Sequence, residues 1–78
     1  MKRVGIIEST NNEIKIIGFG ILQGTDTVYD EDLGLDISVT KVLLDSGNEV
    51  LVKDAFIGDE DSILKEISNY KANGYKIL

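Results

Sequence analysis

The chain is 78 residues long and carries 8 basic against 14 acidic side chains, which gives a net charge of −6. A chain this short forms one domain, here residues 1–78, and buries only about 60% of the surface that its unfolded form exposes. It has no cysteine and no histidine, so disulfides are excluded and no metal site is predicted, because carboxylates alone bind zinc poorly. Good packing or self-association is therefore expected to stabilise the fold.

The negative charge bears on what the protein binds. It repels a phosphate backbone, so we expect no nucleic-acid partner. No apolar run approaches the roughly 20 residues that cross a membrane, and the short apolar stretch after Met1-Lys2-Arg3 is not a secretion signal. The sequence predicts a cytoplasmic domain without membrane contact, and leaves a basic partner, a cation or solubility as reasons for the charge.

Residues 3–8 and 13–23 are the first two predicted strands, joined by the turn formers of residues 9–12. The large apolar residues of the second strand change parity along its length, from Ile14 and Ile16 to Phe19 and Ile21. A strand whose buried side switches at glycines bends sharply and serves two sheets, as at the corners of small barrels.

Glycines 18, 20 and 24 lie at this switch. Their spacing fits neither the dinucleotide fingerprint nor the P-loop, and no Lys-Ser/Thr pair follows. Strand bending explains them better than phosphate binding, and we predict no cofactor.

Residues 24–35 form the longest segment without clear periodicity, and they are rich in Asp, Glu and Gly. Loops of this length are uncommon in compact domains and are often functional. We predict that Tyr29, Asp30, Glu31 and Asp32 bind a protein partner, whose basic groups would meet the acidic rim. The alternative is a loop that only connects two strands and is pinned by its apolar residues.

A second alternative is a cation-binding or weakly catalytic carboxylate site in residues 26–36. Asp30-x-Asp32-x-Gly34-x-Asp36 alternates acidic residues as the calcium loop of an EF-hand does. The match fails in detail, because the glycine comes one position early and Lys41 stands where the last ligand, a glutamate, is required.

The hairpin of residues 41–58 carries the clearest local signal. Asp45-Ser46-Gly47 suits a three-residue loop, a type I turn closed by a glycine in the left-handed region. Leu44 and Asn48 would then face each other and set the register of both arms.

The two arms of this hairpin are strands over residues 36–44 and 49–56. In the first arm the apolar parity changes near Thr40-Lys41, which predicts a bulge there. In the second, Asp54 is in phase with the apolar row and is the best single carboxylate candidate, because partial burial raises a carboxyl pKa; the alternative is a strand-end aspartate that accepts turn hydrogen bonds. Without His or Cys the usual general base and nucleophile are missing, so we predict that the protein is not an enzyme.

A helix is predicted after Gly58, with Asp59 as its N-cap and further acidic residues in its first turn. Its apolar stripe consists of Ile63, Leu64, Ile67 and Tyr70. Asn73-Gly74 ends it, and residues 75–78 form a short last strand. Its unprotected edge makes a homodimer through this strand a further alternative to a protein partner.

The order strand, strand, loop, strand, strand, helix, strand predicts a mainly β (α+β) fold. We expect a small antiparallel, partly open SH3-like barrel of about five strands with one helix before the last strand. The alternative is an α+β sandwich with the helix on one face of an antiparallel sheet. Closure of the sheet distinguishes the two.

The segments LDSGNEV (44–50) and DAFIG (54–58) resemble a pattern in small uncharacterised bacterial and phage proteins. Those carry Leu-Asp-x-Gly-x-x-Val, then an acidic residue, two aromatics and a glycine that lead into a helix. They also carry Gly-Tyr-Gly where this chain has Gly18-Phe19-Gly20, and their aromatic pair is here Phe56-Ile57. The resemblance covers half of the chain; it implies the same fold and a phage or mobile-element origin, and no activity. We predict a non-enzymatic protein-interaction module.

Overall fold

The computed structural model describes residues 2–78. In this range the chain forms one sheet and one helix: β1 (Arg3–Thr10), β2 (Glu13–Asp30), β3 (Leu35–Leu44), β4 (Glu49–Val52), β5 (Phe56–Gly58), α1 (Glu60–Ala72) and β6 (Lys76–Ile77). The strand order is β4-β3-β2-β1-β5, all antiparallel, and β6 adds to the start of β2 in parallel. Within residues 2–78, no helix has the length and apolar character needed to cross a membrane.

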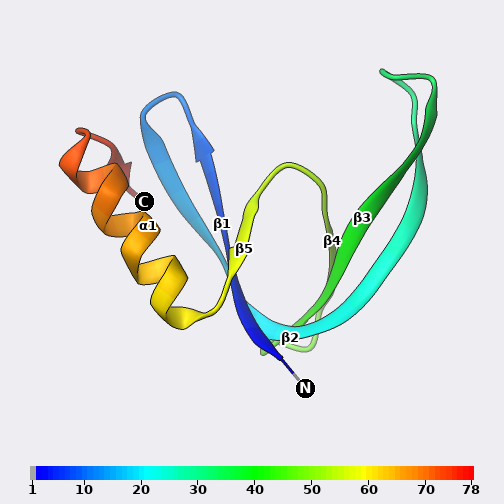
Figure 1. The fold of residues 1–78 in the computed structure, drawn as a ribbon, viewed down its shortest axis with the longest axis horizontal. Helices are drawn as coiled ribbons and strands as arrows, with labels where there is room; N and C mark the ends of the chain where they lie inside the picture. The colour runs from blue at the N-terminus through cyan, green and yellow to red at the C-terminus, as the bar shows by residue number, and fades with distance from the viewer. Residues whose placement is uncertain (1) are drawn as a thin grey trace.

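Strand β2 is shared by the two halves of the sheet. It pairs with β1 from Glu13 to Ile21 and with β3 from Gly20 to Asp30. Between these pairings it curves, so that the β1–β2 hairpin and the β2–β3 ribbon diverge like the sides of a V (Figure 1). The predicted bend of this strand is therefore confirmed.

Gly20 makes the bend possible. It pairs with Val4 of β1 on one side and with Leu44 of β3 on the other. A Cβ at Gly20 would lie 2.0 Å from the carbonyl oxygen of Leu43. The backbones of β2 and β3 approach here more closely than any side chain permits, so only glycine fits.

Apolar side chains cover both faces of strand β1, which lies between β2 and β5. One cluster, inside the V, is built on Val4, Ile6 and Val42. The other, built on Ile7, Ile14 and Ile63, lies between the sheet and α1. Because successive side chains of a strand point to opposite faces, β1 takes part in both clusters and its residues 4–7 are all buried.

The sheet does not close. β5 returns beside β1, while β4 remains at the other end of the strand order with its outer edge free. The predicted mainly β (α+β), partly open fold with one helix before the last strand is confirmed; over the described residues it has six strands, and the sheet stays open. α1 packs against β1, β5 and β6 and covers one face only (Figure 1).

The hairpin loop and the helix start have the predicted geometry. The amide of Gly47, at φ +94°, donates to the Leu44 carbonyl at 2.9 Å, and the Leu44 amide donates to that of Asn48 at 2.8 Å. The Asp59 carboxylate accepts from the Ser62 amide at 2.8 Å, as an N-cap does.

A side-chain link adds to the hairpin loop. The Asp45 carboxylate accepts two hydrogen bonds from the Arg3 guanidinium, at 2.8 and 2.7 Å, so the loop is tied to the start of β1. The same guanidinium lies 5.9 Å from the centre of the Phe19 ring.

Three predicted boundaries are wrong. The segment 24–35 is not a loop: β2 continues to Asp30 and pairs with β3, which leaves only residues 31–34 as a turn. The bulge lies in β2 between Leu22 and Gly24 rather than near residues 40–41, because the extra residue is on the opposite strand. The arm 49–56 is broken at residues 53–55, where the chain leaves β3 to pair with β1.

We expect Gly20→Ala to lower the free energy of unfolding by about 3 kcal/mol or more, because the added Cβ forces the two backbones apart. Urea unfolding measures this change. Gly34→Ala is the matched control: nothing lies within 4 Å of its Cβ, so only the left-handed backbone (φ +69°) opposes it, at about 1 kcal/mol. Equal losses in the two variants would contradict the role of the close approach.

Ile63→Ala is expected to destabilise the fold by about 3 kcal/mol. Ile63 is fully buried between α1 and the sheet, whereas its neighbour Leu64 is 63% exposed. Leu64→Ala is the control and should cost less than about 0.5 kcal/mol. Thermal and urea unfolding of the two variants measure whether the apolar cluster between α1 and the sheet stabilises the fold.

Candidate functional site: a protein-interaction surface

The end of the β2–β3 ribbon, residues 29–36, is here called the ribbon tip. It projects beyond β4, which pairs with β3 only over residues 40–43, so in the part of the chain that the structure describes no third strand pairs with it (Figure 1). Its turn is closed by a hydrogen bond of 2.8 Å from the Gly34 amide to the Asp30 carbonyl. The ribbon tip contains all four residues predicted to bind a partner, Tyr29, Asp30, Glu31 and Asp32.

Asp30 is turned inward. Its side chain is only 4% exposed; one carboxylate oxygen accepts from the Leu33 amide at 3.0 Å and the other from the Lys53 ammonium. These contacts, that of Lys53 first, lower the pKa of Asp30, and the same pair raises the pKa of Lys53. Asp30 therefore holds the turn together, and its charge is already matched within the chain.

The other predicted residues are exposed: Tyr29, Glu31 and Asp32. Tyr29 is 63% exposed and is joined by Leu33 at 62% and Leu35 at 51%. The alternative of a connective loop pinned by its apolar residues would have required these side chains to be buried. Single exposed apolar residues are ordinary, whereas these three lie within seven positions and make the ribbon tip an apolar patch. The sequence did not reveal that residues 24–30 pair with β3. Because of this pairing, residues that were expected in the middle of a loop lie at the end of a two-stranded ribbon.

The patch extends over both faces of the ribbon. Tyr29 pairs with Asp36 and the next residue pairs with Leu35, so the side chains of Tyr29 and Leu35 stand on opposite faces. Glu31, Asp32 and Asp36 surround them, and no salt bridge within residues 2–78 involves these three. A partner that grips the end of the ribbon would meet apolar side chains on both sides within an acidic rim.

The carboxylates of residues 26–36 do not converge. Nowhere in residues 2–78 do three or more acidic side chains gather in positions suited to a metal ion. Asp30 is engaged by Lys53, and Asp26 accepts from the Thr27 amide at 2.8 Å. Asp54 is exposed in the bend at residues 53–55 and does not continue an apolar row, so the partial burial expected of its carboxylate is wrong.

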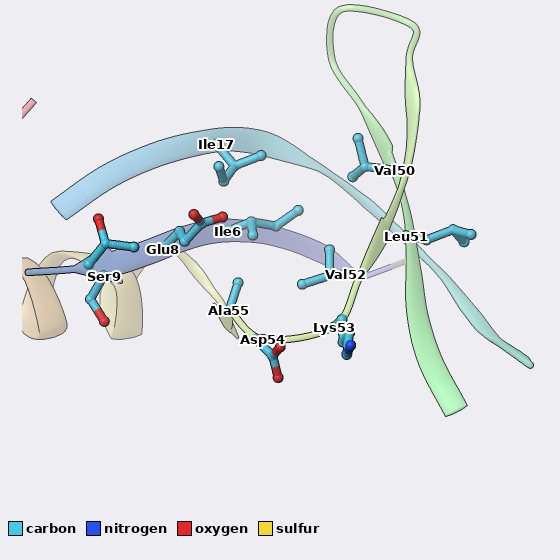
Figure 2. Close-up of a pocket in the computed structure, with 11 residues that line it drawn as sticks. Ile6, Glu8, Ser9, Ile17, Val50, Leu51, Val52, Lys53, Asp54 and Ala55 are labelled. Atoms are coloured by element: carbon cyan, nitrogen blue, oxygen red, sulfur yellow. The ribbon is translucent and has the colours of Figure 1, made fainter. Parts of the chain in front are cut away.

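A cleft of about 590 Å³ opens inside the V, between the β1–β2 hairpin and β4 (Figure 2). Its floor is apolar and comes from three strands, β1, β2 and β4, and from the bend: Ile6, Ile17, Val50, Val52 and Ala55. Its rim carries Glu8, Ser9 and Asp54. Sequence reasoning did not find this cleft, because its walls come from both halves of the sheet and depend on how far the sheet closes.

Comparison of the chain with protein-family models, with curated proteins and with solved structures finds no match in any of the three. The resemblance to small bacterial and phage proteins therefore stays a prediction.

The pKa of the Asp30 carboxyl is expected to lie below the usual 3.9, and Lys53→Met should raise it. A depressed pKa means that the charged pair stabilises the fold above the unfolded-state pKa, and that this contribution disappears as the pH falls through the folded-state pKa. Carboxyl ¹³C NMR titration measures the Asp30 pKa in the wild type and in Lys53→Met. Asp45, whose pKa is lowered by Arg3, is the internal control and should titrate alike in both proteins. An unchanged Asp30 pKa in Lys53→Met would contradict the pairing.

Proposed function

We propose that the protein is a non-enzymatic protein-interaction module that binds a basic partner through the ribbon tip. One observation carries the proposal: Tyr29, Leu33 and Leu35 are all more than half exposed at the end of a projecting ribbon. A chain with so small a core gains stability by burying large apolar side chains. Their exposure at one place is therefore best explained by a partner that covers them.

Charge selects the class of partner. Glu31, Asp32 and Asp36 are exposed around the patch, and the whole chain has a net charge of −6. A partner surface with Lys or Arg side chains around an apolar hollow would be attracted at long range and would match the rim on contact. Such attraction acts mainly on the association rate, which is expected to fall as salt screens it.

The inward-facing Asp30 supports this role indirectly. Through Leu33 and Lys53 it fixes the turn that carries the patch. A surface held in one conformation loses less entropy on binding than a mobile loop. The four predicted residues therefore have two roles: Asp30 positions the turn, while Tyr29, Glu31 and Asp32 contact the partner.

The test is a pull-down from a cell extract with Tyr29→Ala, Glu31→Lys and Asp32→Lys combined, with Asp30 left in place so that the turn survives. The control combines Leu64→Ala, Glu49→Lys and Asp61→Lys. It removes an equally exposed apolar side chain (63% in both cases) and changes the net charge by the same amount elsewhere.

Wild type and control are expected to retain the same partner, and the ribbon-tip variant to lose most of it. Retention should also weaken as the salt concentration rises. Recovery of every partner by the ribbon-tip variant at wild-type levels would reject this surface.

A further inference from the structure

The end of β1 has a free edge with a hollow on each face. β5 pairs with β1 only from Gly5 to Ile7, so within residues 2–78 no strand pairs with residues 8–10 on that side. The cleft lies on the Ile6 face of this edge. A second hollow of about 250 Å³ lies on the other face, lined by Ile7, Ser9 and the ring of Tyr70 from α1.

The bend at residues 53–55 forms the opposite wall of both hollows, because Asp54 and Ala55 line each of them. In Figure 2 this bend diverges from β1 as it runs from β5 back towards β4. The edge of β1 and the bend therefore enclose a wedge, in the place that β5 would fill if it were longer.

Backbone groups point into this wedge. The Ile14 carbonyl accepts a hydrogen bond from the Leu78 amide on the β6 side of β2. The backbone polar groups of Ile14 therefore point away from β1. Ser9 lies opposite Ile14 in the β1–β2 pairing. In an antiparallel pair such opposite residues both turn their N–H and C=O outward. The N–H and C=O of Ser9 thus face the open edge and are free to bind another strand.

The chain's own segment is kept out of the wedge. Lys53 begins the bend, and its ammonium is held by the buried Asp30 carboxylate of the ribbon tip. Pairing of residues 53–55 with β1 would have to move Lys53 away from this partner and leave the buried carboxylate without its counter-ion, held only by the Leu33 amide, which is unfavourable.

The charges of the wedge favour one class of occupant. Glu8 and Asp54 stand at its walls, and neither takes part in a salt bridge within the described residues. Lys53 is the basic residue at the wedge, and Asp30 already neutralises it. An extended peptide with Lys or Arg next to an apolar residue is therefore complementary to these walls.

We propose that residues 8–10 of β1 accept an extended basic peptide of a partner protein as an added strand. Main-chain hydrogen bonds to Ser9 hold the peptide, an apolar side chain enters the cleft, and the neighbouring Lys or Arg on the opposite face meets Asp54. This edge is distinct from the ribbon tip, and the proposal does not depend on binding there.

The probe is an acetylated, amidated hexapeptide of alternating Lys and Val, titrated into ¹⁵N- and methyl-labelled protein and followed by NMR. A hexapeptide of alternating Glu and Val is its matched control. The expected result is that the basic peptide shifts the amides of residues 8–10 and the methyls of Ile6, Ile17 and Val50, and slows hydrogen exchange of the Ser9 amide. The acidic peptide should bind at least tenfold more weakly.

Ser9→Pro tests the strand addition itself. It removes the outward N–H while the hydrogen bonds between β1 and β2 remain, since proline is tolerated where an edge N–H faces solvent. It should weaken binding about tenfold, whereas Ser9→Ala, which keeps the N–H, should bind like the wild type. Asp54→Lys is a second variant whose exposed position spares the fold, and it should reverse the preference between the two peptides.

Several outcomes would overturn the proposal. They are peptide shifts confined to the ribbon tip, no shift in β1 at millimolar peptide, and equal binding by the Ser9→Pro and Ser9→Ala variants. Signals of residues 8–10 that move with protein concentration before any peptide is added would mean that a second copy of the chain fills the wedge. The first outcome leaves the proposed function of the ribbon tip standing, so the two proposals fail separately.

Discussion

At Gly20 the backbones of β2 and β3 come closer than any side chain would permit, and this contact lies where the two halves of the sheet meet. β2 pairs with β1 before this point and with β3 after it. With a straight β2, β4 and β5 would lie at opposite ends of a flat sheet. Because β2 bends, β1 and β4 face each other across one cleft, and the β2–β3 ribbon projects away from α1 (Figure 1).

The bend also explains how 78 residues provide two apolar clusters. β1 lies between them, with Ile6 facing the inside of the V and Ile7 facing α1. Each cluster is thin, but the shared strand is buried on both faces, which a one-sided sheet of this size cannot achieve. The cost is an incomplete sheet, since β5 is too short to cover the whole of β1.

An ion pair between the half-exposed Lys53 and the buried Asp30 connects the two candidate binding regions. Asp30 comes from the ribbon tip and Lys53 from the bend between β4 and β5. Asp30 orders the turn that displays Leu33, and Lys53 keeps the bend away from the free edge of β1. Breaking the pair leaves the buried Asp30 carboxylate without its counter-ion, so a partner that displaced Lys53 would affect both regions together.

The sequence by itself determined the elements whose cause is local. The Asp45-Ser46-Gly47 loop, the Asp59 N-cap and the glycine-rich bend in β2 follow from turn chemistry, capping and residue parity, all of which act between near neighbours in the chain. The position of the candidate surface also followed from the sequence. Tyr29, Glu31 and Asp32 are exposed, as expected for an acidic segment without periodicity.

Only the tertiary structure decided the rest. The pairing of Val28 with Ile37 made a ribbon of an expected loop, and the contact with Lys53 turned Asp30 inward. The cleft and the free edge beside Ser9 exist because β5 stops short on β1. These features join residues far apart in the chain, and hydrogen bonding between strands depends on which backbones meet rather than on local residue preference.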